Sequence, residues 1–250
     1  MREAFTYMFR DNCYYKKAFI YLILNFIANA FLAYAQINSC TGGCPLSSRV
    51  EVLPNTYINN IVFNLLGAVA NLFVLGYFFS AIDAITKQTN NIVLPLFNIK
   101  NCFLKGLKFY IAIFLITLLL VLLSIPLGFI NNIISSVIML GVMLFYLVFA
   151  SSFFWSFANN SKLLTFFNIR EAFKNVIKTP ATYFKNIFFI LLVTIISIIL
   201  AYCFELLFGF FIKSPFITMI FSTLISAILS AYFGFVNMFL IAKSIKLETV

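Results

Sequence analysis

Histidine is absent from this sequence, and acidic residues are scarce, with only 7 Asp and Glu among 250 residues. The absence of histidine removes the commonest general base and the commonest zinc ligand, so neither His-dependent nor metal-dependent hydrolysis is expected. Charged residues make up 10% of the chain, against about 25% in an average soluble domain. A composition so poor in charge excludes a soluble enzyme, a disordered protein and a nucleic-acid-binding module.

Apolar side chains dominate instead: 63% of the residues are hydrophobic, 34 are Phe, and the mean hydropathy is +1.05. A membrane-spanning helix needs about 20 mostly apolar residues, and charges near the bilayer centre are costly. Four long stretches contain no charged residue: 18–48, 52–82, 109–161 and 214–242. Because these runs are continuous rather than alternating, helices are favoured over barrel strands. We predict an all-α polytopic membrane protein with six transmembrane helices, at about 18–36, 60–84, 109–130, 133–157, 187–211 and 217–241.

Basic residues are divided unequally between the connections of these spans. Fifteen of the 17 Lys and Arg fall in the two terminal segments and in the second-to-third and fourth-to-fifth connections, whereas only Arg49 and Lys213 fall elsewhere. The positive-inside rule then places both termini in the cytoplasm of a multi-pass cell-membrane protein. The same basic residues make anionic lipid a candidate partner at the cytoplasmic face of the lipid bilayer. No nucleic acid partner is expected.

The first apolar run also has features of a signal peptide, because basic residues precede it and Ala33-Tyr34-Ala35 offers a small-residue cleavage site. A retained span is the favoured interpretation. The segment before the run is 17 residues long and contains Glu3 and Asp11, and Asn25 and Asn29 interrupt the apolar core. Loss of this run from the mature protein would leave five spans.

An internal repeat organises the chain. Residues 94–108 and 164–178 are identical at six of 15 aligned positions, and residues 2–5 match residues 170–173. Each copy has the spacing of a short amphipathic helix, with Asn98 and Asn168 as N-caps and Glu171 completing a capping-box pattern. We therefore predict a single integral membrane domain, 1–250, of three repeats. Each is a cytoplasmic interfacial helix followed by a transmembrane hairpin, at about 1–84, 94–157 and 164–242.

Three spans carry polar or small residues at helical spacing. The candidate polar intramembrane face comprises Asn25, Asn29 and Gln36 in the first span and Asn60, Asn64 and Asn71 in the second. A candidate packing stripe in the last span comprises Thr223, Ser226, Ser230, Gly234 and Asn237. Two interpretations stay open: hydrogen bonding and close packing between helices, or a polar cavity for a solute, a lipid headgroup or a partner helix.

Other chemistry-bearing residues are few. Cys40 and Cys44 fall in the external loop at about 37–59, where an oxidising compartment would allow a local disulfide. Asp83 is expected to lie at the interface near Lys87, and Glu205 near the outer surface, where it could pair with Lys213. The two carboxylates are in different helices near opposite faces, which does not suit an acid–base pair.

The order and spacing of several short motifs resemble domain-of-unknown-function family 4013, a group of prokaryotic integral membrane proteins of unassigned activity. The resemblance covers most of the chain. It rests on Phe9-Arg10-Asp11, Gly76-Tyr77, Leu94-Pro95, Gly106-Leu107-Lys108, Thr179-Pro180 with Tyr183, and Tyr232-Phe233. The family usually has an acid and a Trp after Leu-Pro, where this chain has Leu96 and Phe97. The resemblance implies a compact membrane protein and supplies no substrate or catalytic residues.

The sequence as a whole favours a noncatalytic membrane module, without cofactor or metal, that packs against lipid or another membrane protein. The short connections favour this interpretation, since nothing large projects from the membrane to recruit soluble partners. The alternative is a small-solute or lipid transporter that uses the polar faces of the first, second and last spans. A charge pair within the membrane and a clearly broken helix, which mark many transporter sites, are missing from the sequence.

Overall fold

The computed structural model describes residues 4, 14–41, 54–87, 94–127, 132–211 and 215–245. All secondary structure in these ranges is helical. The long helices are α2 (Tyr14–Thr41), α3 (Pro54–Lys87), α4 (Ile99–Leu127), α5 (Asn132–Asn160), α7 (Pro180–Phe211) and α8 (Pro215–Ser244). A short 3-10 helix, η2 (Leu163–Phe167), and the helix α6 (Ile169–Lys178) connect α5 to α7.

The prediction of six spans is confirmed. Six helices are long and apolar enough to cross a membrane: Lys16–Tyr34, Ile58–Lys87, Ile99–Pro126, Ile134–Asn160, Pro180–Phe211 and Ile220–Ser244. The fifth begins at Pro180, earlier than the predicted 187, because proline is well tolerated at the first position of a helix.

The prediction of a separate interfacial helix in the second repeat is wrong. Residues 99–108 form the first turns of α4, which continues without a break to Leu127. In the third predicted repeat Thr179-Pro180 ends α6 and starts α7, since proline cannot continue the preceding helix. Lys108 is followed directly by Phe109 and Tyr110 rather than by Thr-Pro, so the equivalent helix runs directly into its span. In the corresponding segment of the first predicted repeat, Ala4 alone of residues 1–13 is among the described residues.

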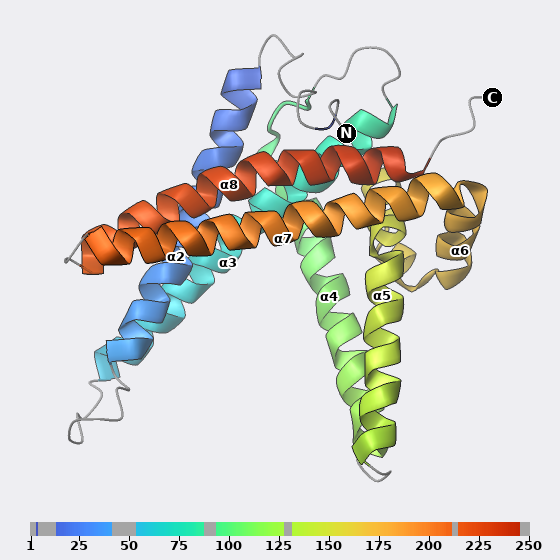
Figure 1. Cartoon of the computed structure of the whole chain (residues 1–250), viewed down its shortest axis with the longest axis horizontal. Coiled ribbons are helices and arrows are strands. Elements are labelled where there is room, and N and C mark those ends of the chain that lie inside the picture. Colours follow the sequence, from blue (N-terminus) through green and yellow to red (C-terminus); the bar gives the residue numbers. More distant parts are fainter. Residues whose placement is uncertain are drawn as a thin grey trace.

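The helices are arranged in three neighbouring pairs (Figure 1): α2 beside α3, α4 beside α5, and α7 beside α8. The tips of the first two pairs point away from each other in this view. The central helix is α3, because it contacts α2, α4, α5 and α8. Its contacts with α4 and α5 include Gly76 and Phe79, away from the tip that it shares with α2. The pairs are therefore held together near one end.

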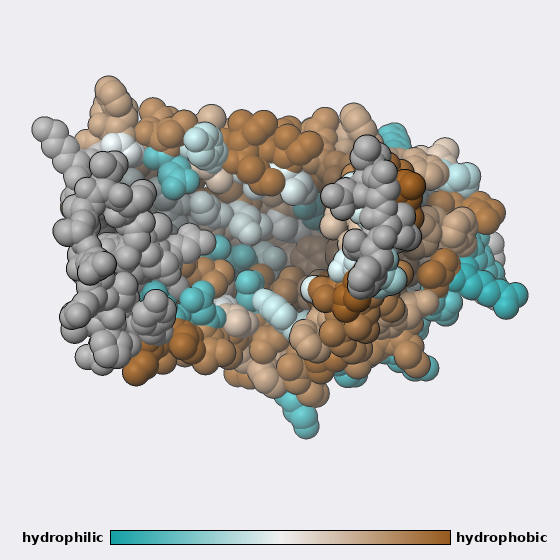
Figure 2. All heavy atoms as spheres, turned by 90° about the horizontal axis from the view of Figure 1, so that it is seen from below, coloured by the Kyte–Doolittle hydropathy of each residue, from teal (hydrophilic) through white to brown (hydrophobic). Residues whose placement is uncertain are grey.

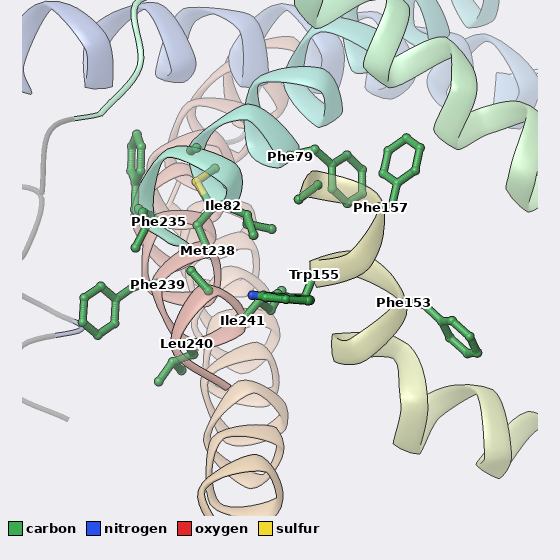
Figure 3. Packing of buried hydrophobic residues seen from close by; sticks show 14 of the residues in the cluster. Phe79, Ile82, Phe153, Trp155, Phe157, Phe235, Met238, Phe239, Leu240 and Ile241 are labelled. Atoms are coloured by element: carbon green, nitrogen blue, oxygen red, sulfur yellow. The ribbon is translucent and has the colours of Figure 1, made fainter. Parts of the chain in front are cut away.

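The core lies where α3, α5 and α8 meet (Figure 3). Its fully buried side chains include Tyr77, Phe79, Ile82 and Ile85 of α3, Phe157 of α5 and Phe235 and Met238 of α8. Phe79 and Phe157 pack edge to face, with ring centroids 4.8 Å apart. Edge-to-face packing is a preferred aromatic geometry, and it contributes to holding α3 against α5.

Glycines allow α3 and α4 to approach each other closely where they cross. A Cβ added at Gly76 would overlap the Cys102 carbonyl, and one added at Gly106 would overlap the Leu72 carbonyl. Each helix thus places a glycine against the other's backbone, as small residues do between membrane helices. The predicted packing stripe of the last span is less tight, because a Cβ at Gly234 would lie 3.1 Å from the Tyr21 hydroxyl.

Candidate functional site

The polar residues predicted in the first and last spans meet at Asn25. This side chain is buried in α2, and its Nδ2 donates to the Tyr21 carbonyl at 2.9 Å. The Ser230 hydroxyl of α8 donates to Asn25 Oδ1 at 3.4 Å. Asn29 Nδ2 donates to the Asn25 carbonyl at 2.9 Å, within its own helix. The amides are thus engaged with backbone carbonyls, and one polar contact links α2 to α8.

The Asn residues of the second span are used differently. Asn64 is exposed, and its Nδ2 donates to the Asn60 carbonyl one turn earlier at 2.8 Å. Asn71 is half-buried and lies within hydrogen-bonding reach of Tyr110 on α4. This stripe consequently points partly toward α4 and partly away from the protein.

The stripe predicted in α8 is shared between two neighbours. Gly234 lies against Tyr21 of α2, whereas Asn237 Nδ2 donates to the Thr194 hydroxyl of α7 at 3.4 Å. Thr223 is buried, and Ser226 is half-buried. These residues therefore contribute to more than one helix contact.

Several predicted sites cannot be placed. The side chains of Gln36 and Cys40 lie outside the described residues, although both positions belong to α2. Cys44 lies outside them entirely, as does Lys213, the predicted neighbour of Glu205. The disulfide between Cys40 and Cys44 stays a prediction.

Asp83 anchors a group of charges at the end of α3. Its carboxylate oxygens lie 2.8 Å from the Lys87 ammonium and 3.7 Å from the Lys105 ammonium of α4. The predicted proximity of Asp83 and Lys87 is confirmed. Sequence reasoning missed Lys105, whose side chain is only 9% exposed. Burying an ammonium is costly unless it is paired, so Asp83 stabilises the start of α4 against α3.

Sequence reasoning also missed a buried polar network that joins α5, α6 and α7. Asn175 Nδ2 of α6 donates to the hydroxyls of Ser152 and Ser156 of α5, at 3.3 and 3.2 Å. The Ser152 hydroxyl donates to the Ala172 carbonyl at 3.4 Å, and the Tyr183 hydroxyl of α7 donates to a carbonyl of α5 at 2.8 Å. The spacing of Ser152 and Ser156, four residues apart in an apolar span, was the signal for it.

The N-caps predicted for the repeated segments are confirmed. The Asn168 side chain accepts from the Glu171 amide at 3.1 Å and donates to Glu171 Oε2 at 3.0 Å. Asn98 accepts from the Asn101 amide at 3.1 Å at the start of α4. A side chain that accepts an otherwise unsatisfied amide fixes where a helix begins.

A hollow opens between the α2–α3 and α4–α5 pairs. Figure 2 shows it from below, with apolar brown rims and a paler floor that contains hydrophilic residues. Among the described residues, no group of three or more Cys, Asp or Glu side chains is placed to hold a metal ion. On the face shown in Figure 2, hydrophilic residues and an opening therefore coincide in this hollow.

Comparison with known proteins gives no relative: no family model, no curated protein and no solved structure matches this chain.

Proposed function

We propose that the protein is a noncatalytic membrane module whose outward-facing helices pack against lipid or another membrane protein. The observation that carries this proposal is the uneven burial of its six spans. In the most apolar window of α4 and of α7 only 6% of the residues are buried, against 50% in α3 and 44% in α8. Most side chains in these two windows thus stay outside the core and face the surroundings of the protein.

We also propose that the chain belongs to domain-of-unknown-function family 4013, that it is built of three repeated hairpins, and that both termini are cytoplasmic. The neighbouring helix pairs of Figure 1 and the capped starts of α4 and α6 support the repeat. The cytoplasmic orientation of the termini is supported by basic residues at helix ends: Lys16 and Lys17 at the start of α2, Lys87 at the end of α3 and Lys243 at the end of α8.

Site-specific photo-crosslinking in the native membrane tests the module. We would place the crosslinker at Phe114 on α4 and Ile198 on α7, which are 66% and 64% exposed. Matched controls on the same helices are Ala112 and Val193, which are buried. We expect adducts with one membrane protein, or with lipid, from the exposed positions alone. Equal labelling at buried and exposed positions would contradict the proposal.

The second candidate is a transporter of a small solute or lipid, favoured by the hollow of Figure 2 and by the exposed Asn64. A transporter moves its substrate when it is reconstituted alone, whereas the proposed module does not. The variants Asn29→Leu and Asn71→Leu separate the two functions. Loss of folding supports a packing role for these residues, and normal folding with lost transport supports a cavity.

A further inference from the structure

The helix α6 presents three distinct faces along its ten residues. Ala172, Asn175 and Val176 are buried against α5. A second set of residues, spaced four apart, is exposed and apolar: Ile169, Phe173 and Ile177. Arg170, Lys174 and Lys178 follow the same spacing and are exposed and basic. With 3.6 residues per turn, these sets form adjacent sectors around the helix, in the order buried, apolar, basic.

The polar network with α5 determines which sector faces outward. Asn175 donates to two serine hydroxyls of α5, and the Ala172 carbonyl accepts from one of them. The Phe173 ring adds an aromatic contact, with its centroid 4.6 Å from that of Phe149. Rotating α6 about its axis would break these contacts, so the apolar and basic sectors are held toward the surroundings.

The position of α6 suits the membrane interface. Figure 1 shows it beside α5, next to the start of α7. Ile177 of the apolar sector is 70% exposed, and Leu164 of the preceding η2 is 78% exposed. Interfacial helices bury such a sector at the boundary of headgroups and acyl chains, with Lys and Arg among the headgroups. The one acidic residue of α6, Glu171, is engaged by the N-cap Asn168.

We infer that α6 is a binding site for anionic phospholipid, with the apolar sector against the acyl chains and Arg170 and Lys174 against the headgroup phosphate. Charge complementarity selects an anionic headgroup over a zwitterionic one. The planar guanidinium of Arg170 can hold two phosphate oxygens, and the ammonium of Lys174, one turn away, adds a second positive charge. This inference names a lipid class for the proposed module and rests on that function.

Native mass spectrometry of the full-length protein in mild detergent tests the site. Phosphatidylglycerol and phosphatidylcholine are titrated separately, and the affinity of the tightest-bound lipid is compared between variants. We expect a preference for phosphatidylglycerol that falls about 25-fold in Arg170→Gln/Lys174→Gln, because each basic residue near an anionic surface contributes about fivefold. The control Lys100→Gln/Lys185→Gln removes two exposed charges outside α6 and should change the affinity less than about twofold.

Three outcomes would overturn the inference: no preference between the lipids, equal losses in both double variants, or full displacement of phosphatidylglycerol by millimolar inorganic phosphate. The last would mean that the site takes a free anion. The crosslinking of the wild-type protein at Phe114 and Ile198 separates this inference from the proposed function. Adducts at these exposed positions without a lipid preference contradict the site alone, whereas a lipid preference without such adducts contradicts the module alone.

Discussion

Replacing Gly76 by alanine tests the crossing of α3 and α4 directly. The added methyl group would overlap the Cys102 carbonyl, which is backbone and cannot rotate away. The two helices would have to separate along their contact, where Phe79 and Phe109 now pack with centroids 4.9 Å apart. Overpacking of this kind costs about 3 kcal/mol at the upper end of its usual range. The gain in helix propensity from Gly to Ala returns about 1 kcal/mol.

The net expectation is a loss of about 2 kcal/mol for Gly76→Ala, and the same reasoning applies to Gly106→Ala, which would meet the Leu72 carbonyl. For a chain of this size that loss lowers the melting temperature by about 4–8 °C. The matched control is Gly141→Ala on α5, where a Cβ would meet nothing within 4 Å. We expect the control to be neutral or slightly stabilising.

Size-exclusion chromatography after heating in mild detergent measures the thermal stability of each variant relative to wild type. Gly76→Ala and Gly106→Ala should lose the monodisperse peak at lower temperature than wild type, while Gly141→Ala should not. If all three variants melt together, the α3–α4 backbones do not approach each other as described, and the reasoning is refuted.

Three further perturbations have clear expected results. Asp83→Asn leaves the buried Lys105 without its carboxylate and should lower the free energy of unfolding by about 3 kcal/mol. Lys87→Gln changes an exposed partner and should lower it by under about 1 kcal/mol. Equal melting temperatures of the two variants would contradict this ranking. Asn175→Ala removes two hydrogen bonds worth about 0.6 kcal/mol each in a membrane protein. The expected result is faster hydrogen–deuterium exchange confined to α6. Unchanged exchange would count against the network. If Cys40 and Cys44 form a disulfide, a membrane-impermeant thiol reagent should label them only after reduction, and labelling without reductant would rule the bond out.

Much of the architecture follows from local sequence. Long uncharged runs predict six spans because the bilayer core admits few charges, and all six appear as helices. The caps at Asn98 and Asn168 were predictable for a similar reason, since an amide side chain at a helix start satisfies a free backbone donor within three residues. Such signals depend only on neighbours in the chain.

Local sequence was a poor guide to which polar residues meet. Asn25, Asn64 and Asn71 lie on regular helical stripes, yet one contacts α8, one is exposed and one faces α4. An amide in a membrane helix can also satisfy itself on its own backbone, so a stripe does not specify a partner.

The sequence by itself determined that this is a helical membrane protein with basic residues gathered at one set of helix ends, because hydropathy and charge act along the chain. Only the tertiary structure decided that Gly76 and Gly106 face each other's helix, that Lys105 reaches Asp83, and that Asn175 orients α6. Each of these contacts joins different helices. Their geometry depends on how helices cross and rotate, and side-chain packing, rather than local propensity, sets that.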